Sequence, residues 1–113
     1  MTTMERLEVA HFKINTVLAQ RLGAALFEFS AAADKPARDK VFSDSVSLWM
    51  VRFNVINEAL KEARNVVKLV TKLAGEQDDI PMPWGAVENL PDAEVLNVLE
   101  KFFVEADGED DDA

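Results

Sequence analysis

Cysteine is absent from the 113 residues of this chain, so neither a disulfide nor a thiolate metal site can form. Histidine occurs once, as His11, which is too little for a histidine metal site. Long apolar runs are also absent: no uncharged stretch reaches the roughly 18 residues of a membrane-spanning helix. Glu5 and Glu8 stand where a secretory signal carries basic and then apolar residues, so we expect no export. These absences favour a cytoplasmic protein without a metal or other cofactor.

Basic residues are almost absent from the last third of the chain. Residues 76–113 contain one, Lys101, against 13 acidic residues, whereas residues 1–75 contain 11 basic and 8 acidic ones. The net charge of −9 therefore comes from the last third. Because this region repels phosphate backbones, direct nucleic-acid binding is not expected. We expect residues 107–113 to be a disordered, solvated acidic tail.

Apolar residues make up 49% of the chain, enough for the core of one domain over residues 1–106. They recur at helical spacing and show no strand pattern, so we predict an all-α fold, a small antiparallel helical bundle. The first predicted helix covers residues 3–33. Its apolar face contains Leu7, His11, Ile14, Leu18, Leu22, Ala25 and Phe29. We expect Gly23, in the middle of this helix, to permit close approach of a second helix.

The clearest pattern is a heptad repeat in a long predicted helix over residues 36–74, which either is continuous or breaks near Ser43. Steps of four and three residues join Phe42, Val46, Trp49, Phe53, Ile56, Leu60, Ala63, Val67, Val70 and Ala74. Gly75 follows as a C-terminal cap. The apolar seam has two interpretations. The other helices of the monomer cover it, or it pairs with another copy to form a homo-oligomer.

An extended connector is predicted over residues 75–90, because Pro81, Pro83 and Gly85 prevent a regular helix. A third helix follows over residues 91–106. Apolar connector residues beside paired aromatics are typical of an interface hot spot, so we consider a partner-binding site here. Its residues are Ile80, Met82, Trp84, Phe102 and Phe103. The alternative is that Trp84 closes the end of the bundle.

A basic stripe lies on the outer face of the long helix, at Lys61, Arg64, Lys68 and Lys72. One interpretation is that these cations complement the negative end of the helix dipole and solvate its surface. The other is that they hold the acidic last third or bind an acidic partner. Exposed ion pairs contribute little, about 0–1 kcal/mol each, so the stripe would guide binding more than hold it.

Catalytic patterns are not found in the sequence. His11 lies on an apolar helix face without an orienting partner in the pattern. The acidic run from Asp107 to Asp112 lacks the alternate ligands and following helix of a calcium loop. Ser43, Ser45 and Ser47 have no accompanying base or glycine-rich loop. We therefore expect a protein that is not an enzyme.

Residues from Leu48–Trp49 through Trp84-Gly85-Ala86-Val87-Glu88-Asn89-Leu90-Pro91-Asp92-Ala93-Glu94-Val95-Leu96 to Phe102–Phe103 resemble the C-terminal half of tailed-phage tail assembly chaperones. In that family a helix, an irregular connector and a short final helix precede a charged tail. Residues 3–33 have no counterpart. The resemblance implies a cytoplasmic helper that binds tape-measure or tail-tube proteins, in the host cytoplasm if a phage encodes it.

Three functions are compatible with the sequence as a whole. The first is a non-enzymatic protein-binding or assembly helper that presents apolar helical surface. The second is an acidic inhibitor that mimics nucleic acid and occupies a cationic site through its last third. The third is a structural subunit of a virion or another oligomeric complex. They differ in whether binding depends on apolar positions, on carboxylates or on stable self-association.

Overall fold

The computed structural model describes residues 2–77, 80 and 84–111, of which 105–111 are described as helix backbone only. Its elements are α1 (Thr3–Ala31), α2 (Lys35–Val41), the π-helical segment η1 (Phe42–Val46), α3 (Ser47–Ala74), the 3₁₀ turn η2 (Val87–Asn89) and α4 (Asp92–Asp111). Every regular element in the described ranges is helical. The predicted all-α class is confirmed.

A capping box starts α1. The Thr2 hydroxyl accepts a hydrogen bond from the backbone N–H of Glu5 (3.2 Å), and the Glu5 carboxylate accepts one from the backbone N–H of Thr2 (3.1 Å). The helix ends at Ala31, two residues before the predicted end. Asp34 then caps α2 by accepting from the backbone N–H of Ala37 (2.9 Å). The buried face of α1 consists of Thr3, Leu7, Ala10, Ile14, Val17, Leu18 and Ala25.

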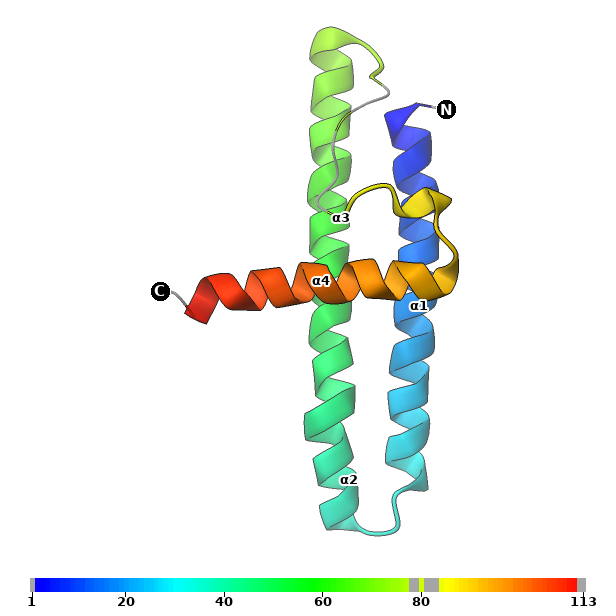
Figure 1. Ribbon diagram of the computed structural model, residues 1–113, viewed down its shortest axis with the longest axis vertical. Coiled ribbons are helices and arrows are strands. Elements are labelled where there is room, and N and C mark those ends of the chain that lie inside the picture. The colour runs from blue at the N-terminus through cyan, green and yellow to red at the C-terminus, as the bar shows by residue number, and fades with distance from the viewer. Residues whose placement is uncertain (1, 78–79, 81–83, 112–113) are drawn as a thin grey trace.

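The predicted long helix is present as α2, η1 and α3 in direct succession (Figure 1). The sequence left undecided whether the helix breaks near Ser43, and the π-helical turn of η1 lies at that position. Because this wider turn shifts the helical phase, Phe42 is 49% exposed although it begins the heptad pattern. Gly75, with φ at +83°, ends α3 as predicted. The seam residues Val46, Ile56, Leu60 and Val67 are buried.

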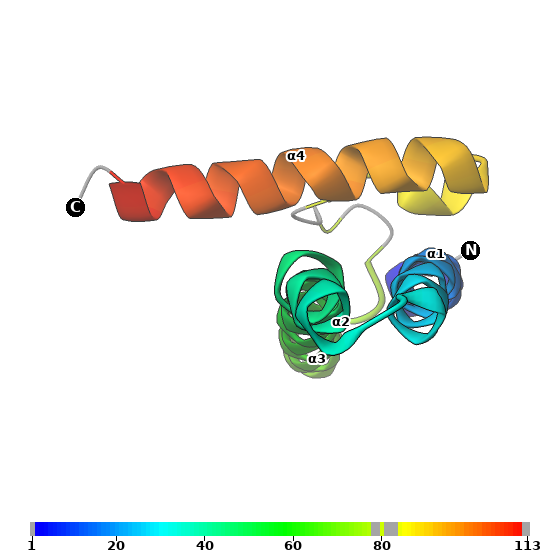
Figure 2. The same cartoon turned by 90° about the horizontal axis from the view of Figure 1, so that it is seen from below.

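The molecule is a flat helical hairpin with one helix laid across it, and it measures 57 × 33 × 21 Å. α1 and α3 run antiparallel side by side, and α4 crosses both (Figure 1). Figure 2 shows α4 on one face of the hairpin; the opposite face has no helix over it within the described ranges. One buried cluster joins α1, α3, the connector and α4, so the heptad seam is covered by the same chain.

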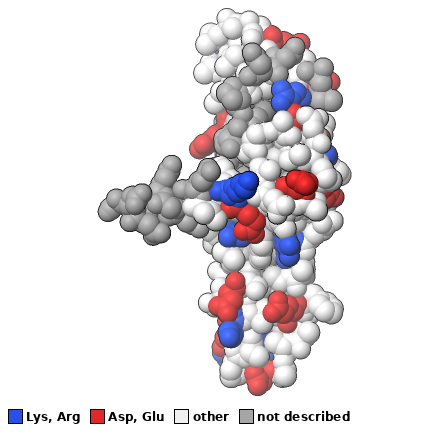
Figure 3. Space-filling view, viewed as in Figure 1, with Lys and Arg blue, Asp and Glu red and all other residues white. Residues whose placement is uncertain are grey.

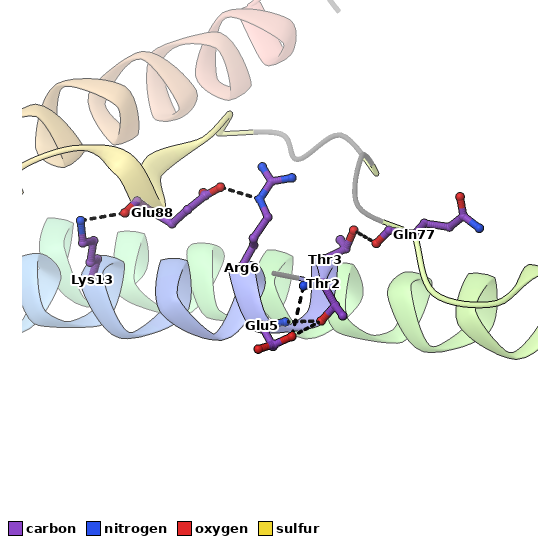
Figure 4. A network of polar contacts seen from close by, with 7 residues as sticks. All are labelled: Thr2, Thr3, Glu5, Arg6, Lys13, Gln77 and Glu88. Atoms are coloured by element: carbon purple, nitrogen blue, oxygen red, sulfur yellow. Dashed lines mark hydrogen bonds and ion pairs between the residues drawn. The ribbon is translucent and has the colours of Figure 1, made fainter.

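The connector after α3 is held on α1 by polar contacts (Figure 4). Near its start, the carbonyl of Gln77 accepts hydrogen bonds from the backbone N–H (3.1 Å) and the hydroxyl of Thr3. At η2, Arg6 forms an ion pair with Glu88 (Nε to Oε1, 2.7 Å). The ammonium of Lys13 donates to the carbonyls of Glu88 (2.9 Å) and Leu90 (2.8 Å). These contacts place the start of α4 over α1.

α4 differs from the prediction at its C-terminal end. The helix continues to Asp111, so the predicted end at residue 106 and the predicted disorder of 107–111 are wrong; residues 112–113 lie outside the described residues. A glycine such as Gly108 costs about 1 kcal/mol inside a helix. Extending a helix already fixed by buried Val95, Leu99 and Phe103 requires no new nucleation, which is the costly step.

Candidate protein-binding surface

Catalytic or metal-binding groupings are not found among the residues that the structure describes. No three of their His, Asp and Glu side chains form a cluster suited to a metal ion. His11 is half-buried, and its Nδ1 lies 2.9 Å from Nη2 of Arg64. Because a guanidinium only donates hydrogen bonds, Nδ1 is the acceptor, and this contact joins α1 to α3. Within the same ranges, no helix combines the length and apolarity needed to cross a bilayer.

The most extended exposed apolar feature of α3 is a row of six side chains, here called the outer stripe. Five members directly precede a residue of the predicted heptad seam. The sixth, Val51, lies one helical turn from two of those five, so the stripe runs beside the buried seam. Its members are between 42% and 76% exposed. They are Leu48, Val51, Val55, Val66, Leu69 and Leu73. An apolar row of this length on a small protein is typical of an interaction surface.

The outer stripe lies on the edge of the hairpin away from α1. Arg64 points toward α1, because its guanidinium contacts His11. Leu73 follows Arg64 by two and a half helical turns and therefore projects from the opposite side of α3. Figure 3 shows mainly uncharged surface over the C-terminal end of α3 in the view of Figure 1. A partner could therefore approach this edge without displacing α1.

The middle of the outer stripe is acidic and indented. Glu58 and Glu62 continue the helical spacing between Val55 and Val66. Together with Asn54, Val55 and Ala59, they line a shallow depression that is open to solvent. The small side chain of Ala59 leaves room there. The stripe therefore consists of two apolar halves separated by two carboxylates.

α4 adds acidic sequence beside the same edge. Figure 1 shows its C-terminal end projecting past α3, on the side away from α1. The projecting residues include Glu105, Asp107, Glu109, Asp110 and Asp111. The helix crosses α3 at Arg52, where Nη1 lies 3.2 Å from Oε1 of Glu100. The helix backbone of α4 thus brings an acidic stretch of sequence to the side of the molecule on which the outer stripe lies.

The predicted aromatic site is not exposed as expected. Trp84 and Phe103 are 3% and 4% exposed, so both rings belong to the core and Trp84 closes the connector over the hairpin. Ile80 and Phe102 are half-buried and pack against the same core. The Phe102 and Phe103 rings meet edge to face, with centroids 5.7 Å apart. Met82 lies outside the described residues.

The predicted basic stripe is mostly exposed, and among the described side chains it forms no ion pair with the acidic last third. Lys61, Lys68 and Lys72 are exposed, whereas Arg64 is half-buried against His11. Lys61 follows Arg52 by two and a half turns, so it projects from the side of α3 opposite α4. The interpretation that the stripe holds the acidic last third stays a prediction, because Asp78, Asp79 and the side chains of 105–111 are not described. Lys68 and Lys72 line an open depression with Thr3 and Met4 of α1 and with Glu76, the first residue of the acidic last third.

Two features were missed by the sequence analysis. Arg52 lies between two rings, with its Cζ 4.9 Å from the Trp49 centroid and 5.0 Å from that of Phe103. The outer stripe was missed because the heptad pattern explained the helix without it. Its signal was nevertheless in the sequence: apolar residues precede seam residues at positions 48, 55, 66, 69 and 73. A helix with two adjacent apolar rows offers more apolar width than one neighbour covers.

The comparisons with known proteins give no relative. No family model matches the chain, and no match was found among curated proteins or among solved structures. The surface described above therefore rests on the chain's own geometry.

Proposed function

We propose that this protein is a non-enzymatic protein-binding or assembly helper that holds a basic amphipathic helix of a partner on the outer stripe. The single observation that carries the proposal is the half-exposed row of six Val and Leu side chains along one edge of α3. A helix laid along such a row with residues at three- and four-residue spacing would cover both apolar halves.

Burial of the outer stripe contributes enough free energy for specific binding. Fully burying one Val or Leu side chain contributes about 1.5–3 kcal/mol, so burying six half-exposed ones contributes roughly 5–9 kcal/mol. The partner's apolar side chains contribute a similar amount. Association costs about 4–15 kcal/mol in lost translational and rotational freedom. The balance favours a moderate affinity rather than a permanent complex, which suits a helper that releases its partner.

Charge selects the kind of helix. Glu58 and Glu62 lie at the centre of the outer stripe, and the acidic end of α4 projects beside it. A partner helix with Lys or Arg between two apolar segments would pair with both. Complementary charge raises the association rate and the specificity more than the affinity. An acidic or uncharged helix would leave the two carboxylates without partners.

The experiment uses a helical probe peptide with Leu at both ends and Lys or Arg at its centre, and measures its dissociation constant. Leu69→Ser combined with Leu73→Ser should weaken binding tenfold or more, since both side chains would lose apolar contacts. Glu58→Lys combined with Glu62→Lys should weaken it several-fold, and more at low salt. The matched control is Met50→Ser, because Met50 is 47% exposed on α3 but lies off the stripe.

The opposite pattern supports the acidic inhibitor. Its affinity would be indifferent to Leu69 and Leu73, would require the carboxylates of residues 105–112, and would fall steeply between about 50 and 200 mM salt. A stable oligomer that binds no added helix would support the structural subunit instead.

A narrower proposal follows from the sequence resemblance. The partner would be a tape-measure or tail-tube protein, and the protein would act in the cytoplasm during tail assembly. Co-expression with each candidate and co-purification at moderate salt tests this form. Recovery of the complex with the wild-type chain, and its loss with the Leu69→Ser, Leu73→Ser variant, is the expected result. Equal recovery of both would contradict the assignment of the surface.

A further inference from the structure

A second apolar edge lies on α1 and is independent of the outer stripe. Phe12 and Phe27 are 74% and 75% exposed, the highest values among the large apolar side chains of α1. Val9 and Leu26 are 38% and 48% exposed beside them. A single exposed apolar residue is ordinary, but two exposed rings on one helix edge are not required by the fold.

This edge faces away from α3. His11 points to α3 through its contact with Arg64. Val9 and Phe27 are rotated about 160° from His11 at 100° per residue, and Phe12 about 100°. Figure 1 shows α1 and α3 at opposite edges of the hairpin, so the two apolar edges do not overlap.

The residues between the two rings are small. Thr16, Ala19 and Gly23 continue the helical spacing from Phe12 to Phe27. Nothing lies within 4 Å of the position that a Cβ on Gly23 would take. The expected close approach of a helix at Gly23 is therefore not made within the described chain. A glycine lowers helix stability relative to alanine, so its position on this edge is otherwise unexplained.

The edge matches itself under an antiparallel two-fold rotation. The edge has one ring at each end, Phe12 and Phe27, and small residues between them on both sides of the midpoint next to Ala19. Two antiparallel α1 helices centred there would set each Phe12 against the other copy's Phe27, with small residues meeting at the centre. Such a self-complementary patch is what an isologous two-fold contact requires.

Charge distinguishes this edge from the outer stripe. The positions from Val9 to Phe27 along the edge are uncharged, namely Val9, Phe12, Thr16, Ala19, Gly23 and Phe27. Self-pairing of the outer stripe, by contrast, would bring Glu58 and Glu62 of both copies together. Like charges in close contact disfavour association. A second copy therefore fits α1 better than α3.

The area suits a weak dimer that forms as the protein concentration rises. A phenylalanine side chain buries about 150–250 Å², so four rings that are three-quarters exposed would bury on the order of 600 Å². Val9, Leu26 and the flanking polar residues add to this. Stable specific interfaces bury roughly 1,200–2,000 Å² in total, and transient ones bury less.

We propose that this protein forms an antiparallel homodimer through the α1 edge defined by Val9, Phe12, Thr16, Ala19, Gly23 and Phe27. This arrangement leaves both outer stripes pointing outward and replaces the predicted homo-oligomer through the long helix. It does not rest on the partner-binding proposal.

Sedimentation of the full chain over a concentration series tests the dimer. The wild type should change from 12.6 kDa to twice that mass as concentration rises. Gly23→Leu should weaken the dimer at least tenfold while leaving the monomer folded, because the space at Gly23 is open within one chain. Phe12→Ser with Phe27→Ser should do the same. Met50→Ser, at a 47% exposed site on α3, should leave the dimer unchanged.

Disulfide trapping tests the orientation, since the chain has no cysteine of its own. Ala19→Cys, next to the two-fold axis, should form a linked dimer on oxidation. Ser30→Cys should not, because antiparallel helices place its two copies about 30 Å apart. A wild type that stays monomeric at several hundred micromolar overturns the proposal. So does a dimer unaffected by Gly23→Leu, or one trapped through Ser30→Cys and not through Ala19→Cys.

Discussion

Arg52 of α3 and Glu100 of α4 form an ion pair at the point where the two helices cross, with Nη1 and Oε1 3.2 Å apart. The side chain of Arg52 is 16% exposed, whereas that of Glu100 is 43% exposed. The guanidinium also lies over the rings of Trp49 and Phe103. Because exposed ion pairs contribute little, the ring contacts carry most of the stabilisation at this crossing.

Replacing Arg52 should therefore cost more than replacing its acidic partner. Arg52→Ala is expected to lower the free energy of unfolding by about 2–3 kcal/mol, through lost stacking and packing. Arg52→Lys should cost about 1 kcal/mol, since it keeps the charge but not the planar group. Urea unfolding measures both, with Lys61→Ala as the exposed control on the same helix. An Arg52→Ala cost below about 0.5 kcal/mol would show that α4 is held elsewhere.

Trp84→Ala is expected to destabilise the fold by about 3–5 kcal/mol, because the ring is buried in the core cluster. Its indole Nε1 is buried and has no hydrogen-bond partner in the described part of the chain. Trp84→Phe removes that unsatisfied donor and should cost less than about 2 kcal/mol. Thermal and urea unfolding compare the two variants. Equal costs would mean that the indole N–H is satisfied in solution.

Removal of residues 107–113 should lower the helical circular dichroism signal while changing the free energy of unfolding by less than about 1 kcal/mol. The segment includes helix up to Asp111 but contains no large apolar residue to add to the core. The matched control is removal of residues 112–113 alone. A large fall in melting temperature that 0.5 M salt abolishes would reveal an electrostatic role for this end.

The capping box predicts a small dependence of stability on acid pH. The pKa of Glu5 lies below its ordinary value. The largest cause is the hydrogen bond from the backbone N–H of Thr2, and the second is the hydrogen bond from the Thr2 hydroxyl. A lowered folded-state pKa means that the stabilisation is present above the unfolded-state pKa and is lost as pH falls through the folded one. Glu5→Gln should flatten this part of the stability profile. NMR titration of the Glu5 carboxyl provides the direct measurement, and an unshifted pKa would contradict the box.

The helices were predictable because their signals are local. The heptad seam, Gly75 and the proline-rich connector are readable from spacing and from backbone chemistry alone. The burial of Trp84 was not, since an apolar residue in a connector looks the same in sequence whether it covers a core or meets a partner. Its burial depends on Thr3, Arg6 and Lys13, which hold the connector from more than seventy residues away.

The orientation of α4 across the hairpin, and the exposure of the outer stripe beside it, also could not be predicted from the sequence. Val95 and Leu99 show which face of α4 is buried, but not whether the helix lies along the hairpin or across it. The crossing depends on one contact to each helix of the hairpin. Lys13 of α1 donates to the carbonyl of Leu90, just before α4, and Arg52 of α3 pairs with Glu100 of α4. The residues of the outer stripe could be predicted, because they are apolar and stand beside the seam in the sequence. Their exposure could not, because it follows from the direction of α4.

The crosswise helix has a consequence for how the chain folds during synthesis. Ribosomes add about 5–20 residues per second, so Phe103 follows Ala74 after a few seconds. During that interval α1 and α3 have been synthesised, yet the surface that Trp84, Val95 and Leu99 later cover faces water. Contacts between distant parts of a chain form last, because closing the longest loop costs the most entropy. The nascent hairpin is thus most prone to aggregation just before α4 packs on it, because α4 is the helix that covers this apolar surface.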